Sequence, residues 1–510
     1  MEKSRIEQSS RNIVFAMINK IIMLLVPFVV RTILIYTLGV NYVGLNGLFS
    51  SILSVLSLAE LGFGSALIVN MYKPMAEDDK ITIRKLLGYY KKVYKIIGVI
   101  ILVSGLMLTP FIGYLVKEDI PRDMNLYILF LLYLFNTCAS YLLFGYRNSL
   151  FIADQRNDIV SKIAAITNIV TYSMQIIVLL IFKQYYMYVI VFPITTILNN
   201  LIIYFLSKKI YPDIFCEDNL DNAIKKDISS KTKALIGHKI GGIVANSLDS
   251  VVISAFLGLV VLGKYNNYYY IMWNILGIVN SITSVIVPSV ANSIIKRNLE
   301  DNKRYFDIFN FVVQGINVLF CTCFICLYQP FIKLWVGAEN TLSISIAILM
   351  TIYFFVNCSR QIVLMYKDAL GLWKPDWLRP YIEAIVNLFL NILLISIIGL
   401  EGVIISTIIS MGFVTIPWET KMLYDQYFKT SSKEYINRLL YNFIVSFICS
   451  SMAYFVCSKL SYTGISAIII NLIVAVIISA IGFLCFYFFT ARFKNTVLFA
   501  KKVIVQLKKK

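Results

Sequence analysis

The sequence predicts an all-α integral membrane protein with about fourteen transmembrane helices. Three observations lead to this class. Of the 510 residues, 59% are hydrophobic and only 15% are charged, and apolar runs of about 20 residues recur along the whole chain. A soluble protein of this length needs more polar surface, and each run is long enough to cross a hydrocarbon core of ~30 Å. The runs are too long for strands and lack the alternation of a membrane β-barrel.

The first half of the chain contains six apolar runs. They cover residues 12–37, 42–71, 93–116, 124–146, 159–182 and 186–207. The polar segment MEKSRIEQSS precedes the first run, which is too long for a signal peptide, so we expect a retained first span. A polar connector, residues 208–233, ends this half.

The second half contains eight further runs. They cover residues 234–257, 265–291, 306–330, 342–366, 378–398, 401–420, 436–457 and 464–490. We therefore expect an N-terminal six-helix lobe (1–207), a cytoplasmic connector (208–233), a C-terminal six-helix lobe (234–428), two additional transmembrane helices (429–490) and a basic cytoplasmic tail (491–510).

One turn between apolar runs occurs twice. It reads Leu38-Gly39-Val-Asn-Tyr-Val-Gly44 and then Leu257-Gly258-Leu-Val-Val-Leu-Gly263. A repeated hairpin at this distance indicates two related, pseudo-symmetric bundles. In membrane transporters, binding sites tend to lie between such repeats.

The distribution of Lys and Arg predicts the orientation. Of these 47 residues, 37 lie in segments on the side of the N-terminus and six in loops on the other side. Cytoplasmic loops carry this excess, so both termini are expected in the cytoplasm. Because the net charge of +19 is spread over many loops of one membrane face, we expect no nucleic-acid partner. The tail, residues 491–510, could instead lie on anionic membrane lipids.

The sequence carries no enzyme signature, and we expect neither a catalytic residue nor a resident cofactor. The chain has one histidine, His238, and no phosphate-binding glycine loop. Its nine cysteines are scattered. Cys321, Cys323 and Cys326 lie in an apolar run without further ligands at metal-binding spacing, so we expect no metal site and no disulfide.

Charged and polar side chains inside the spans are the candidate functional residues. The charged ones are Lys20, Arg31, Glu60, Asp249, Arg360 and Glu383, and four polar or aromatic ones are Asn46, Tyr270, Trp273 and Asn280. A charge within hydrocarbon costs roughly 2.5–3.5 kcal/mol, so such residues normally face a bundle interior or a watery cavity. Pairing between helices, for instance of Arg360 with Glu383, is the structural alternative, and Arg31 could also extend towards the interface.

The repeated turns and the segment 10–90 resemble bacterial polysaccharide flippases of the O-antigen and capsule type. These proteins belong to the multidrug/oligosaccharidyl-lipid/polysaccharide (MOP) exporter superfamily. The resemblance extends more loosely over residues 230–300. It implies two six-helix lobes around a central V-shaped cavity, with two C-terminal helices added. It also implies that an undecaprenyl-pyrophosphate-linked oligosaccharide moves from the inner to the outer leaflet of the bacterial cytoplasmic membrane by alternating access.

The resemblance also implies roles for the candidate residues. Arg31, Lys20 and Arg360 would hold the pyrophosphate, because a cavity cation suits a phosphate. Glu60, Asp249 and Glu383 would bind substrate or couple transport to a H⁺ or Na⁺ gradient. Asn46, Tyr270, Trp273 and Asn280 would contact sugars. Polysaccharide polymerase and glycosyltransferases of the same pathway would be functional partners.

Two transporters of the same fold remain as alternatives: an ion-coupled multidrug antiporter and a flippase for the peptidoglycan lipid precursor. An antiporter for cationic drugs would be expected to have acidic cavity residues without a central cation, and Arg31 counts against it. A membrane glycosyltransferase or polysaccharide polymerase belongs to another class. Those enzymes need an acid/base constellation and usually a sizeable loop domain, and the connector 208–233 is too short to form one.

Overall fold

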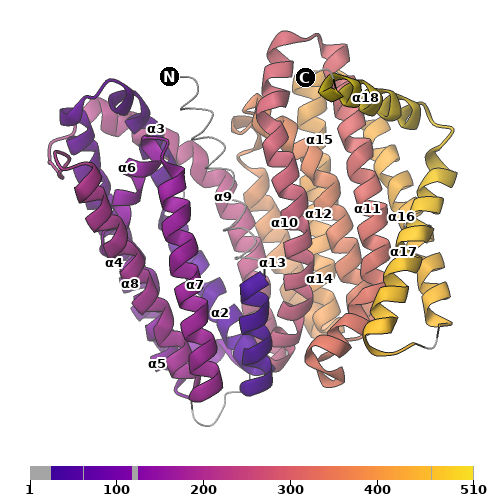
Figure 1. Cartoon of the computed structure of the whole chain (residues 1–510), viewed down its shortest axis with the longest axis horizontal. Coiled ribbons are helices and arrows are strands. Elements are labelled where there is room, and N and C mark those ends of the chain that lie inside the picture. The colour runs from indigo at the N-terminus through magenta and orange to yellow at the C-terminus, as the bar shows by residue number, and fades with distance from the viewer. Residues whose placement is uncertain (1–24, 61, 118–123, 461, 509–510) are drawn as a thin grey trace. The chain divides into compact units, whose positions relative to one another are not determined.

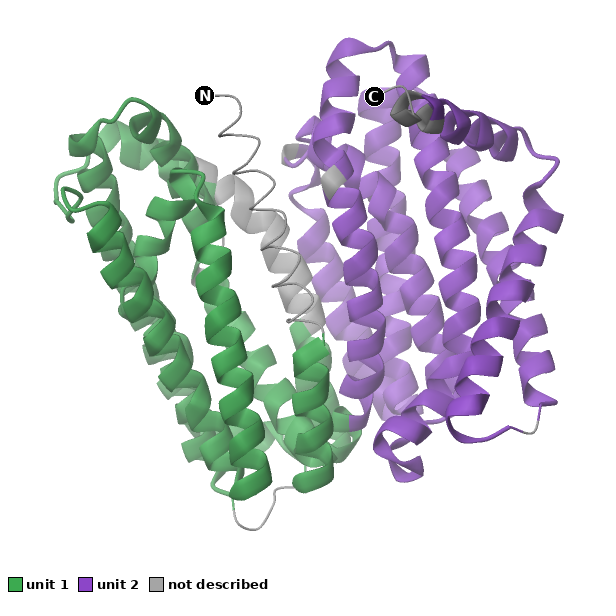
Figure 2. Cartoon of the chain, viewed as in Figure 1, with its two compact units in different colours: residues 1–263 green, residues 264–510 purple. Residues whose placement is uncertain are grey.

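The computed structural model describes residues 25–60, 62–117, 124–460 and 462–508. The described part is helical throughout, with short turns between helices and no strand. The all-α membrane class predicted from the sequence is therefore confirmed. The chain divides into two compact units, residues 1–263 and 264–510 (Figure 2).

Unit 1 is a bundle of long helices interrupted by short ones (Figure 1). Its elements are a helix over Leu25–Thr37, α2 (Val40–Leu56), η1 (Ser57–Glu60), α3 (Phe63–Ala76), α4 (Lys80–Leu108), η2 (Thr109–Leu115), α5 (Leu126–Leu142), η3 (Gly145–Arg147), α6 (Asn148–Ala153), α7 (Asn157–Ile181), α8 (Tyr185–Ile210) and α9 (Asn222–Leu257).

Unit 2 contains most of α10 and all later helices. Its elements are α10 (Leu259–Lys296), α11 (Leu299–Val336), η4 (Ala338–Asn340), α12 (Ile344–Leu370), η5 (Lys374–Asp376), α13 (Arg379–Ile398), α14 (Leu400–Ile409), η6 (Ser410–Thr415), α15 (Ile416–Leu423), η7 (Tyr424–Phe428), α16 (Lys433–Ser458), α17 (Gly464–Tyr487) and α18 (Ala491–Lys508). The segments η6 and η7 are π-helical turns within one continuous span, Leu400–Phe428.

Ten helices of the described residues are long and apolar enough to cross a membrane, or eleven if the bent pair α5–α6 is one span. Three predicted spans correspond to shorter apolar helices, Leu25–Thr37, Val40–Leu56 and Ser247–Leu257. The first predicted span begins outside the described residues, and the second is broken after Leu56. The count of fourteen therefore stays a prediction, whereas a multi-pass membrane protein is confirmed.

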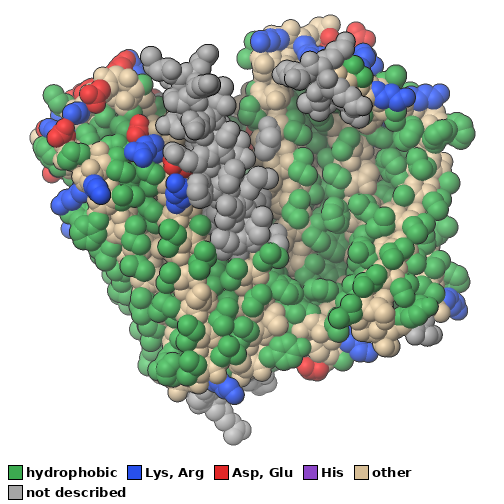
Figure 3. Space-filling model, viewed as in Figure 1, with side chains coloured by type: hydrophobic (Ala, Val, Ile, Leu, Met, Phe, Trp, Pro, Cys, Tyr) green, Lys and Arg blue, Asp and Glu red, His purple; other side chains and the backbone are tan. Residues whose placement is uncertain are grey.

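The surface of unit 2 shows how its helices meet lipid. Along α17, Ile469, Ile473, Ile477 and Ile481 are all at least half exposed, and their four-residue spacing places them on one helix face. Hydrophobic side chains cover the middle of the face in Figure 3, and charged ones lie near its ends. This distribution suits a protein whose middle is solvated by hydrocarbon rather than by water.

The two C-terminal membrane helices pack firmly on unit 2. Phe311 of α11 lies in one buried cluster with Val445 of α16 and Tyr487 of α17. In unit 1, α9 packs against α2 and α3, so the compact division falls at Gly263, after the helix that the sequence assigned to the second lobe. The five predicted segment boundaries stay a prediction.

Candidate functional site

The second predicted span is broken in the middle, next to Glu60. Helix α2 ends at Leu56, one short helical turn follows, and α3 begins at Phe63 after Gly62, whose φ is +81°. Glycine adopts this left-handed conformation without a steric penalty. Irregular backbone at membrane depth is tolerated where it lines a cavity or is buried in protein. The break therefore marks unit 1 as the first place to search for a site.

The Glu60 carboxylate is held at this break by phenol groups. Tyr94 donates a hydrogen bond to Oε1 at 2.9 Å, and Tyr141 donates to Oε2 at 2.6 Å. The hydroxyl of Tyr90 donates in turn to that of Tyr94 at 3.1 Å. Gly64 allows this approach, because a Cβ there would lie 2.7 Å from the Tyr90 hydroxyl. No Lys or Arg of the described residues forms an ion pair with Glu60.

A polar cavity opens beside this carboxylate within unit 1. Its volume is about 520 Å³, and its lining residues are Asn46, Ser50, Leu53, Ser54, Ser57, Glu60, Tyr133, Asn136, Thr137 and Phe192. The side-chain oxygen of Asn46 accepts hydrogen bonds from Tyr133 at 3.1 Å and from Ser50 at 3.3 Å. The structure thus brings two predicted residues, Asn46 and Glu60, to one wall of one cavity.

The opposite wall of this cavity was not predicted. Tyr133, Asn136 and Thr137 come from α5, and the amide oxygen of Asn136 accepts a hydrogen bond from Thr196 of α8 at 2.7 Å. Spacings of three and four residues place Tyr133, Asn136 and Thr137 on one helix face. This periodicity was present in the sequence, but without a charged residue it resembles an ordinary packing face.

The predicted phosphate ligand Arg31 lies elsewhere in unit 1. Its guanidinium interacts electrostatically with the buried Tyr188 of α8, and Tyr188 stacks on Tyr185 with ring centroids 5.6 Å apart. Arg31 is not among the residues that line the cavity beside Glu60. Lys20 lies outside the described residues. Asp249, on α9, is 3% exposed and also lies away from that cavity.

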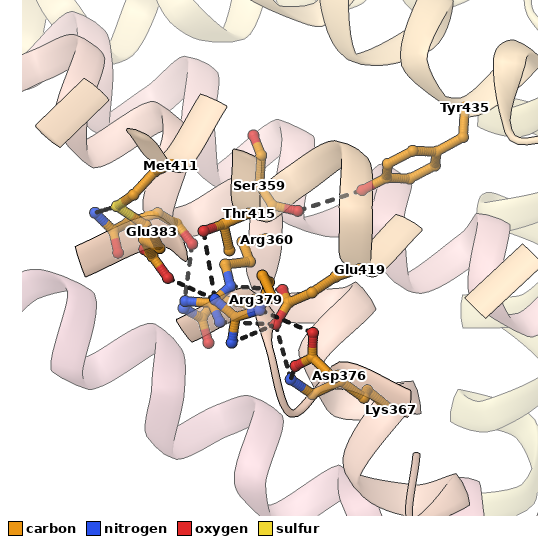
Figure 4. A network of polar contacts seen from close by, with 12 residues as sticks. Ser359, Arg360, Lys367, Asp376, Arg379, Glu383, Met411, Thr415, Glu419 and Tyr435 are labelled. Carbon is orange, nitrogen blue, oxygen red and sulfur yellow. Dashed lines mark hydrogen bonds and ion pairs between the residues drawn. The ribbon is translucent and has the colours of Figure 1, made fainter. Parts of the chain in front are cut away.

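A buried network of charged residues occupies unit 2 (Figure 4). Arg360 of α12 forms two hydrogen bonds with the Glu419 carboxylate of α15, at 2.7 and 2.8 Å. Lys367 contacts Glu419 and Asp376, both at 2.7 Å. Arg379 contacts Asp376 at 2.9 Å, Glu383 at 2.5 Å and Glu419 at 3.3 Å. Three cations and three carboxylates therefore balance.

This network corrects the ion pair suggested by the sequence. The bidentate partner of Arg360 is Glu419, and Glu383 pairs with Arg379. Sequence reasoning missed Glu419 and placed Lys367 and Arg379 in a loop, although all three are buried. Because buried charges need partners, Arg360 and Glu383 already have a structural function. A role in binding pyrophosphate would require Arg360 to exchange Glu419 for the ligand.

The aromatic residues at the start of α10 form a stacked column. Tyr265 stacks on Tyr269 at 5.8 Å, and Tyr269 stacks on Trp273 at 5.5 Å with an interplanar angle of 16°. Trp273 is 42% exposed, so its ring is accessible at the end of this column. The sequence grouped Trp273 with Tyr270. The structure pairs it with Tyr269, four residues earlier.

The last predicted sugar-contact residue, Asn280, lies further along α10. Its amide oxygen is buried and has no hydrogen-bond partner among the described residues. Its backbone carbonyl accepts hydrogen bonds from Thr283 and Ser284. In the described part of the chain, no group of three or more His, Cys, Asp and Glu residues could hold a metal ion.

Comparison with known proteins places this geometry in context. A family model described as "Polysaccharide biosynthesis protein" matches residues 9–294, more than half of the chain. No curated protein matches by sequence.

Solved structures of membrane transporters match the fold. The lipid II flippase MurJ, in an inward closed conformation, matches with a TM-score of 0.67 and 15% identity over 93% of this chain and 99% of that one. An inward-facing multidrug resistance MATE transporter of the MOP superfamily matches with 0.56 and 15%, over 84% and 98%. The Vibrio cholerae MATE transporter VcmN matches with 0.54 and 14%, over 84% and 99%. The fold is that of MOP-superfamily transporters.

Proposed function

Because the chain belongs to the polysaccharide biosynthesis protein family, we propose that it is a flippase for undecaprenyl-pyrophosphate-linked oligosaccharides. The observation that carries this proposal is the polar cavity beside Glu60, in a family tied to polysaccharide synthesis. Its volume of about 520 Å³ lies in the range of small-molecule sites. The amide, hydroxyl and carboxylate groups of its walls can exchange hydrogen bonds with sugar hydroxyls.

The residues of unit 1 would share the work of binding. In this proposal, Asn46, Tyr133 and Asn136 contact sugar hydroxyls, and the Glu60 carboxylate accepts from them. Arg31 and Lys20 would hold the pyrophosphate, because a guanidinium offers five donors and a permanent charge. Alternating access would then move the head group from the inner to the outer leaflet while the lipid tail stays in hydrocarbon.

Glu60 is also the best-placed residue to couple transport to an ion gradient. Its described partners are neutral phenols, so binding of H⁺ or Na⁺ would change the net charge of the cavity wall. Glu383 differs, because Arg379 already neutralises it at 2.5 Å. The position of Asp249, buried on α9, leaves it as a second coupling candidate.

The proposal includes a location and partners. The protein would lie in the bacterial cytoplasmic membrane with both termini in the cytoplasm, following its Lys and Arg distribution. Glycosyltransferases that build the repeat unit would act before it, and a polysaccharide polymerase would act after it.

A deletion strain tests the proposed function. Loss of the gene should stop surface polysaccharide export, and the lipid-linked oligosaccharide should accumulate in the inner leaflet. A plasmid copy should restore export, whereas a copy with Glu60→Gln should not. Normal export in the deletion strain would contradict the proposal. Glu77→Gln is the matched control, because Glu77 lies outside the cavity and forms only a loose contact with Lys73 at 3.9 Å.

A flippase for the peptidoglycan lipid precursor is the second candidate. It is favoured by the fold match to MurJ over 93% of this chain. Both cargoes join a sugar to a lipid through pyrophosphate, so the same cations would serve either. Growth of a strain depleted of its own lipid II flippase, on expression of this chain, would favour the second candidate.

A further inference from the structure

Three helices of unit 2 begin around one cavity, at the end where α18 lies (Figure 1). The cavity has a volume of about 730 Å³ and is lined by residues near the N-terminal ends of α11, α16 and α18. The unpaired N–H groups at a helix start carry partial positive charge and favour anions. Three such helix ends therefore make one region of positive potential.

The charged side chains of this cavity are unevenly paired. Arg438 contacts two carboxylates, Asp307 at 2.7 Å and Glu434 four residues earlier, and its Nε is buried without a partner. Arg304 and Arg492 also line the cavity. Neither has a carboxylate within ion-pair distance among the described residues, since the ion pairs at this end of unit 2 are those of Arg438.

Arg492 is the least satisfied of these cations. It is half-buried at the start of α18. Burial and the neighbouring charge of Arg438 both lower the pKa of Arg492. A buried charge without a partner is unfavourable, and an anion placed between Arg492 and Arg304 would relieve it.

The surroundings of the cavity indicate the depth at which such an anion would bind. Helix α17 crosses the apolar region and ends at Tyr487, which lines the cavity together with the 42% exposed Tyr441. Tyrosines are enriched at the level of lipid headgroups. The following helix α18 carries both lysines and exposed apolar residues, among them Leu498, as expected for a helix lying at a membrane surface.

We propose that this cavity binds the phosphate group of an anionic phospholipid, on the lysine-rich side of the membrane. Arg492 and Arg304 would bind the phosphate oxygens, for which the planar guanidinium is well shaped. Basic pockets between membrane helices bind anionic headgroups in this way. The site lies in unit 2, away from the Glu60 cavity, and does not depend on the identity of the transported cargo.

Lipid binding to the purified full-length protein tests this site. Binding of phosphatidylglycerol, supplied in a neutral detergent and counted by native mass spectrometry, should weaken about fivefold in Arg492→Gln. Arg304→Gln should show a similar loss, and this variant removes an exposed side chain that no described residue pairs. Lys494→Gln is the matched control, because Lys494 is exposed on the same helix and does not line the cavity.

Two further arms identify the source of the phosphate. Phosphatidylcholine and inorganic phosphate at equal concentration should not compete with phosphatidylglycerol. Effective competition by inorganic phosphate would overturn the lipid assignment. Unchanged phosphatidylglycerol binding in both arginine variants, or an equal loss in Lys494→Gln, would overturn the site itself. Unfolding midpoints without added lipid should match wild type in all three variants, so that loss of binding is not loss of fold.

Discussion

Gly44 lies so close to Leu259 that a side chain at position 44 would collide with the backbone of the other hairpin. A Cβ on Gly44 would be 2.1 Å from the Leu259 carbonyl oxygen, and a Cβ on Gly263 would be 2.1 Å from the Val40 carbonyl oxygen. The second glycine of each repeated turn thus admits the first residues of the helix that follows the other turn. The repeat seen in the sequence is a reciprocal backbone contact in the structure.

Alanine at either of these glycines should destabilise the protein. Gly44→Ala and Gly263→Ala must push two backbones apart, and overpacking of this kind costs roughly 1–3 kcal/mol. We expect a lower unfolding midpoint in detergent and reduced export in cells. Gly277→Ala is the matched control in α10, because nothing lies within 4 Å of a Cβ there. Equal midpoints for all three variants would contradict the close contact.

Removal of the phenols that hold Glu60 should impair transport while the protein stays folded. Tyr141→Phe and Tyr94→Phe each remove one hydrogen bond to the carboxylate, and such a bond to a charged group contributes about 1.5–3 kcal/mol. The carboxylate would then lose its fixed position at the helix break. Transport rates in proteoliposomes should fall roughly tenfold or more. Tyr127→Phe is the control, since Tyr127 is 44% exposed and away from the cavity. A fall of the same size in the control would remove the special role of Glu60.

Loss of Glu419 should unfold unit 2 rather than alter transport selectively. Glu419→Gln leaves Arg360, Lys367 and Arg379 with too little negative charge, and breaking a buried pair costs about 3–5 kcal/mol. The yield of monodisperse protein and its unfolding midpoint should both drop. Combining it with Arg360→Gln should recover part of the loss, because the total charge balances again. Glu401→Gln, at a carboxylate that accepts from Ser343 and Ser345, should change little. A stable Glu419→Gln variant would show that the network is not structural.

The exposed ring of Trp273 should contribute to cargo binding. Trp273→Ala removes the accessible end of the stacked column, and an aromatic stacking contact contributes about 0.5–1.5 kcal/mol. The apparent affinity for lipid-linked oligosaccharide should fall roughly two- to tenfold, measured as the cargo concentration at half-maximal transport. Trp377→Ala, at a more exposed tryptophan between α12 and α13, should leave it unchanged. If both variants bind cargo as wild type does, Trp273 is a lipid-interface residue only.

The sequence predicted the class of the protein and one wall of its cavity. Asn46 and Glu60 could be found because polar side chains at helical spacing stand out in an apolar run. Tyr133 and Asn136 could not be assigned to the same cavity, since their contact with α2 joins residues about 87 positions apart and no local pattern reports it. The repeated glycines were visible, but their partners, Val40 and Leu259, are ordinary apolar residues. Likewise, Arg360 was recognised as a buried charge, yet its partner depended on a π-helical turn that re-aims Glu419.

Translocation in proteoliposomes tests the central proposal most directly. The purified protein is reconstituted with a fluorescent undecaprenyl-pyrophosphate-linked oligosaccharide, and the fraction of probe in the outer leaflet is followed by a membrane-impermeant quencher. The account predicts rapid exchange between leaflets with wild-type protein, and exchange near the protein-free level with Glu60→Gln. It also predicts wild-type exchange with Glu77→Gln. Wild-type protein that gives no more exchange than empty liposomes, under both H⁺ and Na⁺ gradients, would contradict the proposed function.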